Sequence, residues 1–442
     1  MAFIRHRAHL HQERAQIGNQ SRKNFRRSCI FPLKNIDLAM ATKSQKFLFY
    51  EDPVQMEPLL PGERALAPLL EHAHDLQRAA LTLSGTSAPP QLRLLLRAMN
   101  SYYSNKIEGQ HTLPAEIESA LRNDYSSDQD KARRQRLALA HMETEAAIES
   151  HWQQWSEGRV WSAQMVREIH QDLFARLSPA DRTLPEGDVL VPGALRDRNV
   201  SVGRHAAPAH TAIGVMLDRW ASFYGGVRRG EAQIVAAAAS HHRLAWIHPF
   251  RDGNGRVARL HTHLALGALG LTNGLWSPLR GFARSHERYY ALLAAADEPR
   301  AGDLDGRGNL SESALVVWIE YVLALCIDQV RFMSGLLEME GMKDRIAACL
   351  AFEENIVRQG VRTEALRALH YLWVTRAELE RSEFKGILNL NNRLATAQVA
   401  ALLKRGLLVT DSPHGKLRFG VPQHALRFYF PHLWPEAEAG AQ

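Results

Sequence analysis

The sequence predicts a mainly helical protein, and three observations lead to this prediction. Apolar residues recur at helical spacing through most of residues 58–404. Only two stretches, 185–208 and 407–419, carry short β-prone segments among Pro and Gly residues. A glycine-rich run at 248–259 leads directly into a helical pattern. With 442 residues and 45% hydrophobic content, the chain can form two or three domains with substantial cores.

The basic charge of the chain lies at its N-terminus. Residues 1–36 hold eight basic residues and one acidic residue, an excess equal to the net charge of +7 of the whole chain. This leader has little apolar periodicity, and Met40 opens the first patterned part. Residues 1–39 are therefore interpreted as an extension from a misassigned start or as a disordered basic arm.

The compartment is predicted from cysteine usage and hydropathy. The three cysteines show no paired spacing, which favours a reducing, cytoplasmic location. The most apolar run, 314–330, contains Glu320 and Asp328, so it is typical of a core helix rather than a membrane span. We therefore expect no contact with a membrane.

The first helical patterns cover 58–85 and 91–108. The second ends in Ser104-Asn105-Lys106-Ile107-Glu108-Gly109. Ser104 and Glu108 are four residues apart and share a helix face, and Gly109 suits the position after a helix end. By itself this segment is typical of an exposed helix end.

Further helices are predicted within 131–180, and then the pattern changes. A hairpin is expected from β-prone pieces at 189–191 and 199–203, bounded by Pro192 and Pro208. Helices resume at 213–224 and 231–247, and the second of these leads to the glycine-rich run.

The glycine-rich run has the composition of a phosphate site. Gly253 and Gly255 permit a tight turn whose N–H groups bind an anion, and a helix begins at Asn254, so its positive end faces that anion. Arg256 and Arg259 lie three residues apart and share a face. The Walker pattern is absent because no Lys-Ser or Lys-Thr follows the glycines.

Two residues of the run add reactive groups. His248 is a proton acceptor at neutral pH, and Asp252 is a hard oxygen ligand for a cation. The four other histidines near the run lack metal-ligand spacing, so they are interpreted as packed or solvated. They are His241, His242, His261 and His263.

The C-terminal part predicts three helices and a two-stranded hairpin. Helical patterns cover 346–358, 363–373, 376–384 and 390–404, and strands are expected at 407–409 and 417–419. Residues 343–431 hold 14 basic and 8 acidic residues. This order is typical of a winged helix, and the positive charge is compatible with DNA contact, although such modules also dock proteins or form dimers.

The run His248-Pro249-Phe250-Arg251-Asp252-Gly253-Asn254-Gly255-Arg256-Val257-Ala258-Arg259 resembles the Fic family signature at every specified position. The resemblance implies transfer of AMP from ATP to a Ser, Thr or Tyr hydroxyl, with His248 as the base and Asp252 holding Mg²⁺. The phosphates would be bound by Gly253, Asn254, Gly255, Arg256 and Arg259. We expect Phe250 to anchor the loop in the core.

Three more segments are similar to parts of that family. Ser104, Glu108 and Gly109 match its inhibitory pattern, in which the Glu108 carboxylate pairs with Arg259 in place of a phosphate. The predicted hairpin is similar to its flap over the site, where a target segment would dock on Val200, Ser201, Val202 and Gly203. Tyr289 and Tyr290 are either core residues or part of the nucleotide pocket.

These observations predict five parts of the chain, which are the leader 1–39, an N-terminal helical region with an inhibitory helix at 40–150, a catalytic core at 151–310, a connecting helix at 311–345 and a winged helix at 346–442. The expected partners are a target protein, the protein itself as a substrate, DNA or another protein at the winged helix, and a second copy in a homodimer. Two alternatives to adenylyl transfer stay open: removal of AMP with Glu108 positioning water, and DNA-binding regulation with a non-catalytic core.

Overall fold

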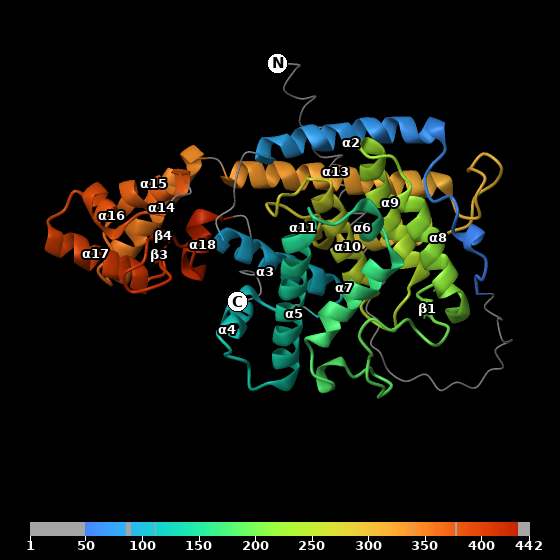
Figure 1. Ribbon diagram of the computed structural model, residues 1–442, viewed down its shortest axis with the longest axis horizontal. Coiled ribbons are helices and arrows are strands. Elements are labelled where there is room, and N and C mark those ends of the chain that lie inside the picture. Colours follow the sequence, from blue (N-terminus) through green and yellow to red (C-terminus); the bar gives the residue numbers. More distant parts are fainter. Residues whose placement is uncertain (1–48, 85–89, 111, 338, 376–377, 432–442) are drawn as a thin grey trace, which may run out of the picture. The chain divides into compact units, whose positions relative to one another are not determined.

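The computed structural model describes residues 49–84, 90–110, 112–337, 339–375 and 378–431, and these are mainly helical (Figure 1). The predicted fold class is confirmed in this respect. The leader at 1–39 and the end of the chain from 432 lie outside the described ranges.

The N-terminal helical region carries the helix with the candidate inhibitory segment. Its elements are η1 (Pro53–Met56), α2 (Glu63–Ser84), α3 (Pro90–Ile107), α4 (Pro114–Leu121) and α5 (Gln129–His151). Asp128 begins α5 by accepting hydrogen bonds from the backbone N–H groups of Asp130 and Lys131. Helix α3 packs against α5 and α11, so its polar end is held inside the protein rather than exposed.

The central helices surround α9. They are α6 (Glu157–Val160), α7 (Ala163–Ala175), α8 (Ile213–Gly225), α9 (Glu231–Ile247), α10 (Asn254–Ala268), α11 (Leu279–Arg284), α12 (His286–Ala296) and α13 (Glu312–Leu337), with short 3-10 turns η2 (Ala180–Arg182) and η3 (His210–Ala212). Helix α9 contacts α2, α8, α10 and α13. The alanines at 236–239 are buried, and their small side chains let these neighbours approach closely.

The central hairpin differs from the one predicted. Strand β1 (Ser201–Val202) pairs antiparallel with β2 (His205–Ala206), whereas residues 189–191 contribute only an isolated bridge between Val189 and Thr183. Gly203, with φ of +59°, makes the tight turn between the strands. The prediction paired the wrong segments because it relied on β-propensity and overlooked this turn.

Helix α13 is long and apolar enough to cross a membrane, judged by length and composition, with a mean hydropathy of 1.7 in its most apolar window. It lies along α2 (Figure 1) and also contacts α9, α11 and α12. Since 56% of that window is buried in the protein, its packing is typical of a core helix. Its Cys326 is a free, buried thiol, as is Cys349 in the next helix.

The C-terminal part contains α14 (Met339–Phe352), a π-helical turn (Glu353–Val357), η5 (Thr363–Ala365), α15 (Leu366–Thr375), α16 (Arg381–Leu388), α17 (Asn392–Lys404), β3 (Leu408–Val409), β4 (Arg418–Phe419) and α18 (Gln423–Tyr429). Strands β3 and β4 pair antiparallel. The predicted order of three helices and a hairpin is present, and its designation as a winged helix stays a prediction.

One predicted helix start in this part was wrong. The predicted helix at 376–384 starts only at Arg381, because Leu379 is extended and forms a bridge with Leu417. Helical periodicity does not locate such a start. Over the predicted connecting helix at 311–345 the structure has α13, which ends at Leu337, and α14, which begins at Met339; residue 338 lies outside the described residues, and this division of the chain stays a prediction.

Candidate active site

The glycine-rich run forms the loop between α9 and α10. His248 follows α9 in a left-handed conformation with φ of +50°, and Gly253 precedes α10 with φ of +81°. A Cβ atom on Gly253 would lie 2.5 Å from a ring carbon of Phe174. Glycine is therefore required at 253 by both the turn and the packing.

Asn254 and Phe250 close this loop. The Asn254 side chain accepts a hydrogen bond from the Phe250 N–H and donates one to the Phe250 carbonyl, both at 2.8 Å. The Phe250 ring is fully buried and stacks on His170, with ring centres 3.9 Å apart. Phe250 thus anchors the loop as predicted, and the Asn254 side chain holds the loop backbone in place.

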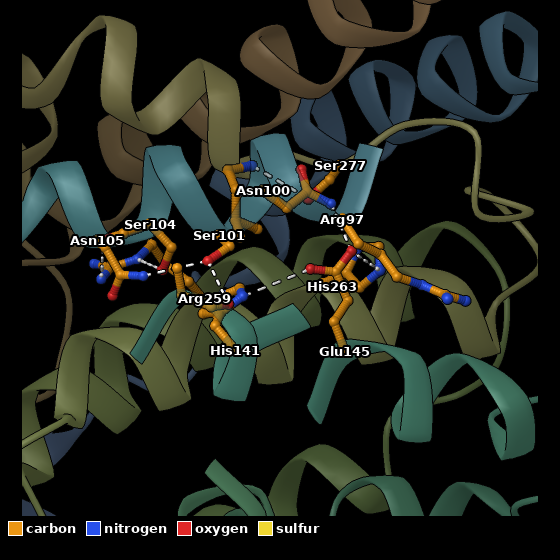
Figure 2. Close-up of polar contacts among 12 residues, drawn as sticks. Arg97, Asn100, Ser101, Ser104, Asn105, His141, Glu145, Arg259, His263 and Ser277 are labelled. Atoms are coloured by element: carbon orange, nitrogen blue, oxygen red, sulfur yellow. Dashed lines mark hydrogen bonds and ion pairs between the residues drawn. The ribbon is translucent and has the colours of Figure 1, made fainter. Parts of the chain in front are cut away.

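Arg259, on α10, meets the end of α3. Its Nη2 donates to Glu108 Oε1 at 2.6 Å and to the Ser104 carbonyl at 3.1 Å, and its Nε donates to Ser104 Oγ at 3.1 Å (Figure 2 shows Ser104 and Arg259). Ser104 is fully buried, so this helix end is not exposed. The expected contact between Glu108 and Arg259 is present.

The Glu108 carboxylate lies over the first turn of α10. A Cβ atom on Gly255 would be 2.3 Å from Glu108 Oε1, so the glycine leaves the space that the carboxylate occupies. Burial raises the pKa of Glu108, but the charges of Arg259 and Arg256 outweigh this and hold the pKa below its ordinary value. An ionised carboxylate therefore stands at a helix N-terminus, where unpaired N–H groups favour an anion.

Asp252 and Arg256 form a second ion pair in the loop. Both Asp252 oxygens lie 3.2 Å from Arg256 Nη2, and Oδ1 accepts a hydrogen bond from the Gly253 N–H at 2.6 Å. Burial raises the pKa of Asp252, yet the Arg256 charge and the Gly253 hydrogen bond lower it below its usual range. The side chain remains 41% exposed, so Asp252 offers an ionised, accessible oxygen.

His248 presents a neutral imidazole. Burial, followed by the nearby charge of Arg196 and by His205, lowers the pKa of His248 to about 4. Arg196 also fixes the loop backbone, because its Nε donates to the His248 carbonyl at 2.8 Å and its N–H to the Pro249 carbonyl at 2.9 Å. Above about pH 5 the imidazole can therefore accept a proton.

Arg196 connects the hairpin segment to the loop that carries His248. Arg196 Nη2 also donates to the Pro208 carbonyl, so one buried guanidinium joins both bases of the hairpin segment to the residues around His248. On the hairpin itself Ser201, Val202 and Gly203 are exposed, and Val200 is half-buried. The exposed part of the hairpin is thus tied to the site at its base.

Tyr289 and Tyr290 have different environments. Tyr289 is buried, and its hydroxyl forms a 2.9 Å hydrogen bond with His241 Nε2, which places it in the core. Tyr290 is 44% exposed, and its hydroxyl donates to the carbonyl of Ile107 at 3.0 Å. Tyr290 therefore touches the end of α3 immediately before Glu108, and a nucleotide-pocket role for either tyrosine stays a prediction.

A second polar group, here called the distal cluster, lies on the same face of α3 about two turns before Ser104 (Figure 2). It comprises Arg97, Asn100, Glu145, Glu149 and His263. Arg97 donates to Glu149 Oε2 from Nε at 2.8 Å and from Nη2 at 2.6 Å. Asn100 donates to Glu145 Oε1 at 2.6 Å. His263 Nε2, from α10, lies 3.2 Å from Glu149 Oε1.

Three side chains of the distal cluster have the spacing of metal ligands, because donor atoms of Glu145, Glu149 and His263 lie within 4.8 Å of one another. Burial raises the pKa of Glu145 to about 8, so Glu145 carries a proton at neutral pH and Glu149 is the ionised carboxylate that pairs with Arg97 and His263. Burial lowers the pKa of His263, but Glu149 and Glu145 outweigh this and raise it above its ordinary value.

His141 lies between the distal cluster and Arg259 (Figure 2). It is fully buried, neither ring nitrogen has a hydrogen-bond partner among the described residues, and its Nδ1 is 3.8 Å from Glu145 Oε2. Burial, and then the charges of Arg259 and Arg256, lower the pKa of His141 to about 3. The ring is therefore neutral and acts as an uncharged spacer.

Sequence reasoning did not identify several of these residues. His170 supports the loop by accepting a hydrogen bond from the Gly193 N–H at 2.8 Å and by contacting the Asp252 carbonyl at 3.3 Å. Arg196 and the distal cluster were missed as well. Their only sequence signal is a charged or polar side chain at a core-facing position, which has meaning only when the partner helix is known.

Comparison with known proteins supports the assignment of the loop. Residues 160–266 match the model of the Fic/DOC family. Proteins named protein adenylyltransferase Fic from Drosophila mojavensis and Drosophila melanogaster are 28% identical over 138 residues, which is 31% of this chain and 26% and 27% of those proteins. The chain thus spans about a quarter of the length of the curated relatives it matches.

Solved structures are similar to longer parts of the chain. A Fic family protein from Desulfovibrio desulfuricans G20 is 17% identical with a TM-score of 0.49, and the match covers 83% of this chain and 99% of that one. Fic-1 from C. elegans is also 17% identical, with a TM-score of 0.46, over 62% of this chain and 73% of that one.

Proposed function

We propose that this protein transfers AMP from ATP to a Ser, Thr or Tyr hydroxyl of a target protein or of itself, because residues 160–266 match the Fic/DOC family model. The observation that carries the proposal is the contact of Glu108 with Arg259, 2.6 Å long, at the start of α10. The Glu108 carboxylate lies where the N-terminus of α10, Arg256 and Arg259 favour an anion. In the Fic family signature this position is expected to bind phosphates. In this state the protein is autoinhibited by Glu108.

The loop residues supply the chemistry in this proposal. Neutral His248 takes the proton of the target hydroxyl while the hydroxyl oxygen bonds to the α-phosphorus of ATP. The bond from that phosphorus to the β-phosphate oxygen breaks, and pyrophosphate leaves. Arg256 and Arg259 stabilise the negative charge that develops on the leaving group.

Asp252 fits the magnesium ion that this reaction uses. Its carboxylate is ionised and 41% exposed, and Mg²⁺ prefers hard oxygen ligands together with the phosphates of a nucleotide. Bound there, the ion would neutralise phosphate charge. Arg256 now occupies both Asp252 oxygens, and the same guanidinium is free to turn to a phosphate once a cation takes its place.

The hairpin is the proposed docking place for the target. Ser201 and Val202 form a short strand with exposed side chains, and an extended peptide can bind such a strand by main-chain hydrogen bonds. Because Arg196 joins the base of the hairpin to the His248 backbone, a peptide bound there would bring its hydroxyl towards the base.

The test uses ATP labelled at the α-phosphate, with Mg²⁺ and a cell lysate as a source of targets. We expect weak labelling by the wild type and at least about tenfold more by Glu108→Gly, because Arg259 is freed for the nucleotide. Adding His248→Ala to Glu108→Gly should lower labelling by a factor of about 10² to 10⁴, the usual contribution of a general base.

Two controls accompany this experiment. His286→Ala, which changes an exposed histidine of α12, should leave the labelling by Glu108→Gly unchanged. ATP labelled at the γ-phosphate should give no labelled protein, which separates adenylyl transfer from phosphorylation. Failure of Glu108→Gly to label any protein from α-labelled ATP would refute the proposed function.

Removal of AMP is the second candidate activity. It is favoured by the position of Glu108, whose ionised carboxylate is 28% exposed within the site and could orient a water molecule. Release of AMP from a pre-modified protein by the wild type, lost in Glu108→Ala, would support it. Release that persists in Glu108→Ala would exclude this role of Glu108.

The C-terminal part is proposed to contact DNA or another protein. Arg393 and Lys404 are exposed on α17, and Lys416 is exposed in the segment between β3 and β4. If DNA is the partner, binding should weaken with salt and be lost when these three residues are changed to Ala. A gel-shift assay at two salt concentrations measures this.

A further inference from the structure

We propose that the distal cluster sets the register of α3 against α10 and thereby holds Glu108 on Arg259. The inference rests on the proposed function, because it concerns the regulation of that site. The side chains of the distal cluster have a positioning role in this proposal, because they do not touch the proposed nucleotide-binding site. Arg97 and Glu108 are eleven residues apart, which corresponds to about 16 Å along the helix.

The two contacts link α3 to α10 by different routes, because Arg259 meets Ser104 and Glu108 directly whereas the distal cluster passes through Glu145 and Glu149 of α5. On α3, positions 97, 100, 101, 104 and 108 follow helical spacing and form one polar stripe. On α10, Arg259 contacts that stripe directly, and His263, one turn later, is linked to it through Glu149 of α5, which also accepts from Arg97. A shift of α3 along its axis would therefore change both contacts together.

Buried charges specify this register more strongly than the apolar contacts do. The apolar face of α3 repeats similar side chains, including Leu92, Leu96 and Met99, and can accept a shift of one turn. The same shift, about 5.4 Å, would separate Arg97 from Glu149 and leave buried charges unpaired. Losing one partner of a buried ion pair is strongly destabilising, and fixing a register is the best-attested use of such pairs.

The contact at the site cannot set the register by itself. Glu108 is 28% exposed, and nucleotide phosphates would compete with it for Arg259. In the distal cluster Glu149 is 5% exposed, and Glu145 and His263 are buried. The distal cluster therefore stays intact when Glu108 is displaced, and it returns the helix to its inhibited position afterwards.

The first test measures labelling by variants of the distal cluster. Arg97→Met and, as an isosteric second variant, Glu149→Gln should each raise labelling at least about threefold over the wild type. In the Glu108→Gly background the same changes should not alter labelling further, because the inhibitory Glu108 carboxylate is already absent. The matched control is Arg78→Met, which changes an exposed arginine of α2 and should leave labelling unchanged.

The second test does not depend on activity. Hydrogen exchange of the amides at 101–110 should be at least about fivefold faster in Arg97→Met than in the wild type or Arg78→Met. If Glu108→Gly labels nothing, the proposed function fails and this exchange rate alone decides the inference.

Three results would overturn the inference. The first is an unchanged rate of amide hydrogen exchange at 101–110 in both Arg97→Met and Glu149→Gln. The second is labelling that rises equally with and without Glu108. The third is a stoichiometric metal ion that the wild type binds and Glu149→Gln does not. A merely structural role predicts a different pattern, in which labelling falls in both backgrounds, and this pattern would also refute the proposal.

Discussion

The two ends of the polar stripe on α3 differ in how they hold their charges. In the distal cluster, Glu149 is almost fully buried and shares its oxygens between Arg97 and His263. At the site, Glu108 is partly exposed and pairs with one arginine at the start of α10. We propose that exposure of the acid, rather than the length of its ion pair, separates a contact that persists from one that a phosphate replaces.

The largest expected difference between the two ends is in stability. Glu149→Ala should lower the free energy of unfolding by about 3 kcal/mol, because it leaves Arg97 and His263 without their buried partner. Glu108→Ala should cost about 1 kcal/mol, because water can reach its place and Ser104 still binds Arg259. Urea unfolding followed by circular dichroism measures both, and equal losses would contradict the comparison.

The second prediction tests whether the contact at the site is replaceable. In proteins carrying His248→Ala to stop turnover, ATP and Mg²⁺ should stabilise the Glu108→Ala form by about 2.7 kcal/mol at a concentration of one hundred times Kd. The form that retains Glu108 should be stabilised less at the same concentration, since the carboxylate competes for Arg259. Thermal melting checks this, and identical shifts of Tm would show that Glu108 does not compete.

The third prediction concerns His141, between the two ends. The pKa of His141 is about 3 in the folded protein and about 6.5 when unfolded. Below pH 6.5 the unfolded state therefore binds more protons than the folded state, and the free energy of unfolding decreases as the pH is lowered. At pH 5 this amounts to about 2 kcal/mol. His141→Leu should remove that loss, so urea unfolding at pH 7.5 and pH 5 should depend less on pH than in the wild type. Equal pH dependence of the two proteins would show that His141 is not buried in neutral form.

The smallest effect is expected at Tyr290. Tyr290→Phe removes the hydroxyl that donates to the Ile107 carbonyl at the end of α3. The loss of stability should be within about 1 kcal/mol, because the side chain is partly exposed. Labelling should rise less than in Arg97→Met. A larger rise would mean that the end of α3, rather than the distal cluster, sets its position.

Local patterns allowed much of the fold to be predicted. The spacing of apolar residues located α3, α8 and α9 to within a residue or two, because each helix buries one face or all faces along its length. The central hairpin and the start of α16 were predicted wrongly. Those features depend on a turn at Gly203 and on a bridge from Leu379 to a distant strand.

The candidate site also has a part that could be predicted from the sequence and a part that could not. Twelve consecutive residues bring His248, Asp252, Gly253 and Arg259 together through a single loop, so their grouping could be predicted from sequence. Glu108 was linked to Arg259 only by resemblance to a family pattern. Nothing in their spacing of 151 residues indicated a contact.

The sequence by itself determined the helices and the composition of the glycine-rich loop, because both depend on interactions between near neighbours in the chain. The tertiary structure decided which charges are buried and which partners they meet. Arg97 and Arg259 are both ordinary surface residue types, and each acquires its partner only when α3 packs beside α5 and α10. Burial removes water from the distal cluster, whereas Glu108 stays partly exposed, so α3 carries one contact that is shielded from water and one that water can reach.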